Sequence, residues 1–162
     1  MNFDTVVLAE GVTTDSRGAF AVVGLNQRVI AVRQLPTQIR LTLLAIFSDE
    51  ADDQQEGFAS PARNIKVAVT LRSPSGSVMF AATSGPVPQA PKQWQDLPGF
   101  GNFIVDLPLV AETTGVHRVE IDLEEDNAVV DRAAKRIYVV RASTLNASTS
   151  DSTQGVNRTG DT

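Results

Sequence analysis

The sequence predicts an all-β fold, namely an antiparallel β-sandwich of about eight strands followed by a disordered C-terminal tail. Three observations support this. Short runs rich in Val, Ile and Leu alternate between apolar and polar residues with a period of two, and clusters of turn-forming residues separate these runs. Between them, no helical pattern has the length of about 10–15 residues that a crossover between parallel strands needs.

The clearest strand signal is Ile65–Arg72, in which every second residue is apolar. Residues His117–Leu123 alternate in the same manner. A strand that is apolar on one face only is typical of an antiparallel sheet with one solvated face. Both segments therefore predict strands of such a sheet, with Val67, Val69, Val119 and Ile121 in the core.

The same criteria predict eight strands in all. Ile39–Phe47 is apolar on both faces, which favours a central strand or one covered by a loop. A helix is the competing interpretation of this run, but no cap or polar stripe supports it. A closed barrel remains an alternative to the sandwich. The predicted strands are Phe3–Ala9, Ala19–Gly24 continuing toward Val32, Ile39–Phe47, Ile65–Arg72, Ser77–Ala82, Asn102–Leu107, His117–Leu123 and Lys135–Arg141.

The predicted turns lie between these strands. Ser73–Gly76 contains Pro and Gly at positions suited to a hairpin. Asp15–Gly18 is expected to link the first two strands, Glu112–Gly115 to precede the seventh, and Glu125–Asn127 to lead into the eighth.

Three segments depart from the alternating pattern. Asp49–Arg63 is acidic and polar, which predicts a long mobile loop. Ser84–Phe100 contains four prolines and the only tryptophan, Trp94. Residues 143–162 are rich in Ser and Thr and too poor in apolar residues to offset the entropy of ordering. We therefore expect a sandwich domain over residues 1–142 and a disordered tail over residues 143–162.

Composition excludes several classes of function. The chain has no cysteine and one histidine, so thiolate chemistry and zinc sites built on these residues are not expected. A net charge of -5 disfavours nucleic acid as a partner. No apolar run is long enough to span a membrane, and the N-terminus lacks the pattern of a signal peptide. A cytoplasmic protein that does not bind membranes is the expectation.

His117 is the residue best suited to general base catalysis. That role needs a nucleophile and an orienting carboxylate nearby, and no serine lies in a Gly-x-Ser-x-Gly elbow. We expect instead a solvated histidine, on the polar face of its strand or at the strand edge.

Two acidic clusters are candidates for calcium binding, because loops at one end of a sandwich can converge their carboxylates. Neither has the spacing of an EF-hand loop, and acidic clusters in polar loops are usually solvated. The candidate ligands are Asp49, Asp52, Asp53 and Glu56, with Glu50, in the first cluster, and Asp122, Glu124 and Asp126, with Glu125, in the second.

Trp94 is a candidate anchor for a protein partner, because tryptophan is enriched among the residues that dominate interface energies. Packing back over one end of the core is the alternative role. The glycine-rich Gly99–Gly101 precedes a strand and no helix, so it lacks the helix N-terminus of a phosphate-binding loop.

The chain resembles a bacterial family of small β-sandwich domains whose function is not known. The likeness is carried by Val7–Val12, Gly18–Leu25, Leu35–Leu43, the hairpin at Val69–Gly76 and the closing strands from Phe103 onward. It covers roughly residues 3–141, and every matching position is apolar or a turn residue. The resemblance implies the fold and no activity, ligand or catalytic residue.

The sequence therefore predicts a non-enzymatic interaction or assembly module, with a protein partner or self-association and no cofactor. Edge strands and long loops are the features of a sandwich that commonly make protein contacts. The alternative is a module that binds a small ligand or carbohydrate, or that binds through calcium. A hydrolase with paired carboxylates is the third hypothesis, and it requires two carboxylates in one cleft.

Overall fold

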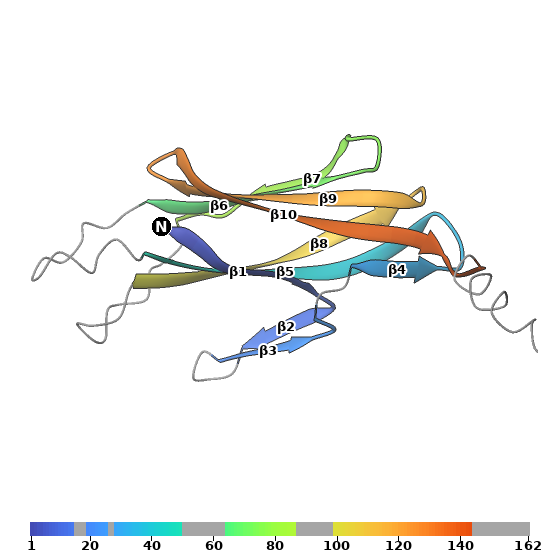
Figure 1. The fold of residues 1–162 in the computed structure, drawn as a ribbon, viewed down its shortest axis with the longest axis horizontal. Coiled ribbons are helices and arrows are strands. Elements are labelled where there is room, and N and C mark those ends of the chain that lie inside the picture. Colours follow the sequence, from blue (N-terminus) through green and yellow to red (C-terminus); the bar gives the residue numbers. More distant parts are fainter. Residues whose placement is uncertain (15–18, 26–27, 50–63, 87–98, 144–162) are drawn as a thin grey trace, which may run out of the picture.

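The computed structural model describes residues 1–14, 19–25, 28–49, 64–86 and 99–143, and these ranges contain ten strands (Figure 1). In chain order they are β1 (Asn2–Ala9), β2 (Gly11–Thr14), β3 (Phe20–Val23), β4 (Val29–Val32), β5 (Thr37–Asp49), β6 (Ile65–Arg72), β7 (Val78–Thr83), β8 (Gly99–Ala111), β9 (Gly115–Glu125) and β10 (Ala128–Arg141).

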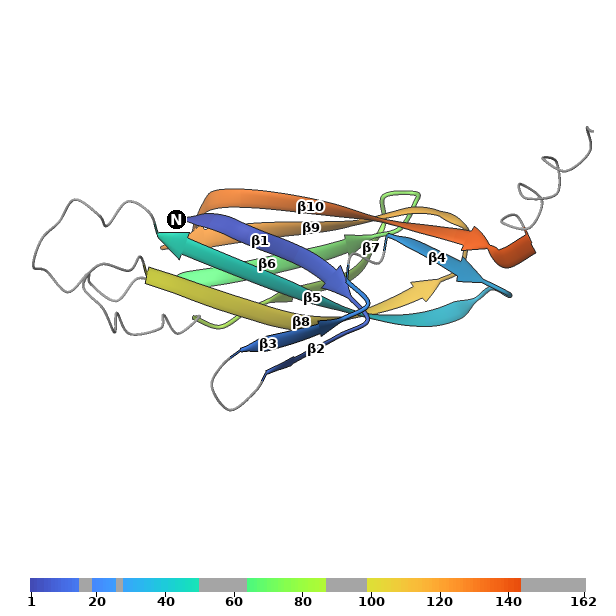
Figure 2. The same ribbon diagram turned by 60° about the horizontal axis from the view of Figure 1, so that its bottom comes forward.

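Two sheets pack face to face as the layers of a sandwich. One has three strands in the order β1-β5-β8, and the other has five in the order β4-β10-β9-β6-β7. The hairpin β2-β3 lies on the side of the three-stranded sheet that faces away from the five-stranded one (Figure 1). In Figure 2, which is turned so that this side comes forward, β1, β5 and β8 form the layer nearer the viewer.

The strand order is that of an immunoglobulin-like sandwich. Strands β1, β5 and β8 occupy the places of A, B and E, and β6, β9 and β10 those of C, F and G. Every pairing is antiparallel except that of β4 with β10, which is parallel. The chain therefore leaves the three-stranded sheet after β1 and joins the edge of the other sheet at β4.

The core lies between the two sheets and follows the predicted alternation. In β6 and β9 every second residue is fully buried, Val67, Val69, Val119 and Ile121 among them. Strand β5 is central in its sheet, and its outward-facing Leu44 is only 3% exposed. This confirms the expectation of a central strand buried on both faces and rules out the helix considered for this run.

A two-residue turn joins β9 to β10. Asp126 and Asn127 both have positive φ, at 50° and 67°, and they connect the directly paired Glu125 and Ala128. Two such residues form a type I′ turn, whose twist matches that of the flanking strands. Nζ of Lys66 donates a 2.9 Å hydrogen bond to Oδ1 of Asn127, which ties β6 to the turn.

The structure confirms the antiparallel sandwich and shows where the strand predictions were incomplete. The predicted run from Ala19 toward Val32 is two strands, β3 and β4, which belong to different sheets. Strand β2 was missed, because its four residues carry little apolar alternation. The two sheets are separate, so the barrel alternative is wrong.

Candidate functional site

The outward face of the five-stranded sheet carries its side chains in rows, because the strands pair in register. One row is apolar and exposed: Val29 of β4, Tyr138 of β10 and Val116 of β9 are directly paired. Their exposed fractions are 53%, 37% and 41%. This row of three apolar side chains crosses the sheet at the end where β4 joins it.

The next row consists of three arginines, Arg136, Arg118 and Arg72, which are paired across β10, β9 and β6. Like charges directly opposite each other are destabilising. Glu120 relieves this on one side, since Nε of Arg72 and Nε of Arg118 lie 2.8 Å and 3.3 Å from its two carboxylate oxygens.

The hydrogen bond from Arg72 holds the pKa of Glu120 below its usual range. Partial burial acts in the opposite direction, and the charges of Arg72 and Arg118 add to the lowering. Glu120 thus stays ionised and serves two of the three arginines. Arg136 has no such carboxylate within salt-bridge distance among the described residues.

A hollow of about 430 Å³ lies farther along this face. Its floor contains the short side chains of Ala68, Thr70 and Ala134. Its charged side chains are largely paired with one another, since Nε of Arg132 lies 3.3 Å from Oδ1 of Asp122 and the other arginines share Glu120. Such a surface already satisfies most of its own charge.

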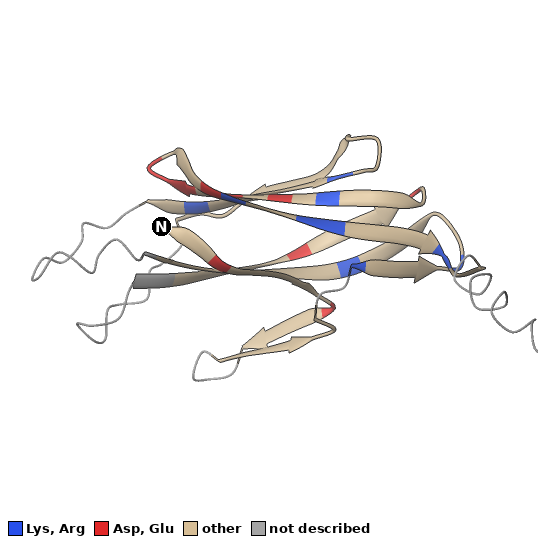
Figure 3. Ribbon diagram, viewed as in Figure 1, with Lys and Arg blue, Asp and Glu red and all other residues tan. Residues whose placement is uncertain are grey.

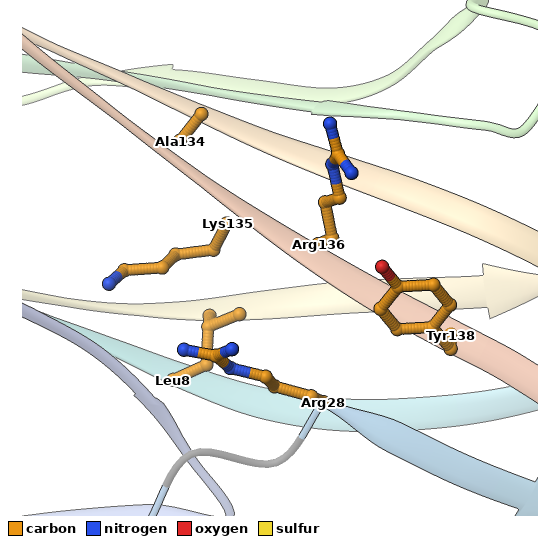
Figure 4. A pocket seen from close by; sticks show the side chains of 6 residues that line it. All are labelled: Leu8, Arg28, Ala134, Lys135, Arg136 and Tyr138. Carbon is orange, nitrogen blue, oxygen red and sulfur yellow. The ribbon is translucent and has the colours of Figure 1, made fainter.

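A second hollow differs in its charge. It has a volume of about 290 Å³ and lies along β10 where β4 begins, and we call it the β10 groove (Figure 4). Its lining residues come from the end of β1, from the residue before β4 and from the middle of β10. They are Leu8, Arg28, Ala134, Lys135, Arg136 and Tyr138.

The cations of the β10 groove lie on both sides of its strand. Lys135 and Arg28 extend on the side of Leu8, whereas Arg136 extends on the opposite side and the ring of Tyr138 stands at one end (Figure 4). Three cations and no acid line this groove, in a chain of net charge -5. Figure 3 shows basic positions along β10, while acidic positions gather at the turn between β9 and β10.

The backbone of β10 is open at the groove. The amide of Tyr138 donates a 2.6 Å hydrogen bond to the carbonyl of Arg28, so the backbone of Tyr138 points toward β4. Backbone groups alternate in direction along a strand, so those of Ala134 and Arg136 point to the same side. Strand β4 pairs only with Tyr138–Arg141, and no described residue forms a ladder with this edge at Ala134 and Arg136.

The β10 groove presents hydrogen-bond donors, and no carboxylate lines it. Its donors are two guanidinium groups, one ammonium group, a phenol hydroxyl and the free backbone amides of the strand edge. Donors of this kind are suited to carboxylate or phosphate oxygens. Its lining residues include no Ser, Thr, His, Asp or Glu.

The expectation for His117 was wrong. The histidine is 1% exposed and lies on the core face of β9 with Val119 and Ile121. His117 lies two residues before Val119, so the alternation of the strand places it on the core face. The prediction failed because it gave more weight to the polar character of histidine than to its position in the strand. Burial lowers the pKa of His117, the backbone of Gly115 acts in the opposite direction, and Nδ1 has no hydrogen-bond partner.

The second acidic cluster is arranged along a strand. Asp122 and Glu124 lie on the outward face of β9, where they are paired with Arg132 and Lys66 respectively, and Asp126 lies in the turn. Within the described ranges, no three His, Cys, Asp or Glu side chains gather as a metal site would require. Of the first cluster, Asp49 ends β5, and Glu50, Asp52, Asp53 and Glu56 lie outside the described residues.

Trp94 also lies outside the described residues, as do residues 144–162 of the predicted tail and the predicted turn at Asp15–Gly18. Gly101 is part of β8, directly paired with Phe47. A Cβ at Gly101 would lie 2.5 Å from Cε2 and Cζ of the Phe47 ring, so the glycine makes room for the core.

The residues of the β10 groove were not singled out from the sequence. The available signal was the stretch Arg132–Arg141, in which four cations occur without an acid. Arg28 is more than a hundred positions away from Lys135, and only the parallel pairing of β4 with β10 brings the two together.

Comparison with known proteins gives a limited result. The chain is similar to the CARDB domain of the PF1109 protein from Pyrococcus furiosus. With its crystal structure, determined in complex with di-metal ions, the identity is 13% and the TM-score 0.40, over 87% of this chain and 97% of that one. With the solution NMR structure of the same domain the identity is 14% and the TM-score 0.37, and the match covers 86% of this chain and 98% of that one. At these values the likeness carries no conclusion about this chain.

No family model matches the chain. No curated protein matches it either. The resemblance to a bacterial sandwich family therefore stays a prediction. In the part of the chain that the structure describes, no helix has the length and apolar character needed to cross a membrane.

Proposed function

We propose that the protein is a non-enzymatic interaction module that binds another protein at the β10 groove and at the adjoining row of Val29, Tyr138 and Val116. The observation that carries the proposal is the pairing of an exposed tyrosine with cations that have no acidic partner among the described residues. Tyrosine and arginine are enriched among the residues that dominate interface energies.

The composition of the surface supports a protein as the ligand. The apolar row supplies area that loses water on contact, and Arg136 beside it supplies directional donors. Small-molecule sites are concave and mostly apolar, with volumes of about 300–1,000 Å³. The β10 groove, at about 290 Å³ and lined mainly by charged and polar residues, matches that description less well.

Selection from a library of random linear peptides tests the proposal. The full chain is immobilised, and bound peptides are enriched over several rounds. We expect peptides whose binding is lost in Tyr138→Ala and Arg136→Ala and kept in Arg33→Ala, a control that removes an exposed cation beyond the far end of β4. Peptides that bind all variants equally, or no enrichment at all, would contradict the proposal.

A further inference from the structure

We infer that the β10 groove takes an extended segment rich in carboxylates, which adds as a strand to the open edge of β10 at Ala134 and Arg136. The inference rests on the proposed function and specifies the partner: a protein segment with at least two adjacent acidic residues. Strand addition of this kind gives affinity through main-chain hydrogen bonds and specificity through alternating side chains.

The direction of the backbone supports strand addition. The Tyr138 amide points toward β4. A second line of evidence starts on β6: the carbonyl of Val67 accepts a hydrogen bond from the amide of Ser84, the residue after β7, so the backbone groups of Val67 point toward β7. Because backbone groups alternate in direction along a strand, those of Arg72 point toward β9. Arg72 is paired with Arg118, so the backbone groups of Arg118 point toward β6. Arg118 is also paired with Arg136, and since Arg118 points away from β10, the backbone groups of Arg136 point away from β9. Both routes place the amide and carbonyl of Arg136 on the open edge.

The side chains define the sequence of the added segment. Successive residues of a strand point to opposite faces of the sheet. In the groove, Lys135 and Arg28 lie on one face and Arg136 on the other (Figure 4). Two adjacent acidic residues therefore meet cations on both sides, whereas a segment with acids at every second position meets only one set.

The geometry also limits the segment. Strand β4 occupies the edge from Tyr138 onward, so the added strand ends there. A second copy pairing through the same edge would bring Lys135 and Arg136 close to their own equivalents. Like charges at close range disfavour such a pairing, whereas an acidic segment complements the groove.

The test uses a labelled ten-residue peptide with a central Asp-Glu-Asp-Glu and its analogue with Asn and Gln at these positions. Fluorescence anisotropy measures binding to the full chain. We expect the analogue to bind at least about tenfold more weakly, and binding of the acidic peptide to fall with added salt. Lys135→Glu and Arg136→Glu weaken binding by roughly tenfold each, and Arg33→Glu leaves it unchanged within about twofold.

Two peptides methylated on alternate backbone nitrogens test strand addition itself. Only one of the two sets of amides faces β10, so one methylated peptide should lose binding and the other should keep it. Equal binding of both, or equal binding of the acidic and amide peptides, would overturn the inference. This comparison uses the unaltered chain, so it does not depend on how any variant folds.

The outcome separates this inference from the proposed function. Library peptides that depend on Tyr138 but carry no acidic residues would overturn the acidic segment and leave the interaction module standing. Failure of every peptide to bind would overturn both.

Discussion

The backbone amide of Phe3 donates a 2.7 Å hydrogen bond to Oδ2 of Asp131, which joins residues 128 positions apart and links β1 of one sheet to β10 of the other. The second oxygen, Oδ1, accepts a 2.7 Å hydrogen bond from the amide of Arg132. Asp131 lies at an irregularity of the β9-β10 ladder, where the register shifts. The bulge thus directs a carboxylate toward the other sheet.

Replacing this carboxylate should destabilise the fold. We expect Asp131→Ala to lower the free energy of unfolding by about 1.5–3 kcal/mol, because a part-buried and an exposed hydrogen bond to a charged acceptor are lost. Asp122→Ala, which removes only an exposed ion pair with Arg132, should cost below about 1 kcal/mol. Urea denaturation of both variants checks the comparison, and equal costs would argue against the special role of Asp131.

Gly101 and Phe47 form a second coupled pair. A methyl group at Gly101 would overlap the fully buried Phe47 ring, so Gly101→Ala should cost about 1–3 kcal/mol. In a Phe47→Leu background the ring is absent, and the same change should cost clearly less. Thermal or urea unfolding of the four proteins gives the coupling energy; additive effects would contradict the proposed overlap.

His117 predicts a pH dependence. Burial lowers its folded-state pKa, so the unfolded chain takes up a proton first, near pH 6.5, as the pH falls. Stability is therefore full above pH 6.5 and declines below it, by at most about 1.4 kcal/mol per pH unit, until the folded-state pKa is reached. His117→Leu removes this group and should flatten the profile between pH 7.5 and 5.5. Identical profiles for the two proteins would refute the assignment.

Glu120 should matter most at low salt. Glu120→Gln removes the negative charge that faces Arg72 and Arg118, so the row of three arginines is no longer compensated. We expect the free energy of unfolding to fall by about 0.5–1 kcal/mol, and this decrease to shrink as salt is added. The pKa of Glu120 is lowered in the fold, so its contribution to stability is fully present above the ordinary pKa of a glutamate, 4.5, and is lost as the pH falls below that value toward the folded-state pKa. A loss that is independent of salt would mean that Glu120 acts through packing.

The sequence was sufficient to predict the sandwich because alternation is a local signal. In β6 and β9 each residue's face follows from its position, and the turn at Asp126 and Asn127 was located correctly. Strand β2 gave too weak a pattern. The division between β3 and β4 could not be read from the sequence, because their assignment to different sheets depends on long-range pairing.

The candidate site was less accessible to sequence reasoning. Lys and Arg side chains are exposed in most proteins, so nothing about Arg28, Lys135 or Arg136 as single residues indicated a binding site. Their shared groove results from the parallel contact of β4 with β10 and from the early end of that contact at Tyr138. Neither feature leaves a local pattern, whereas the position of His117 on the core face did leave one.

Amide hydrogen exchange at Ala134, Lys135 and Arg136, followed with and without the acidic peptide, tests the central claim most directly. The Ala134 and Arg136 amides face the open edge, while the Lys135 amide points toward β9. We expect exchange at Ala134 and Arg136 to slow markedly when the peptide binds, and exchange at Lys135 to change little. Binding of the peptide with unchanged exchange at Ala134 and Arg136 would contradict strand addition to β10.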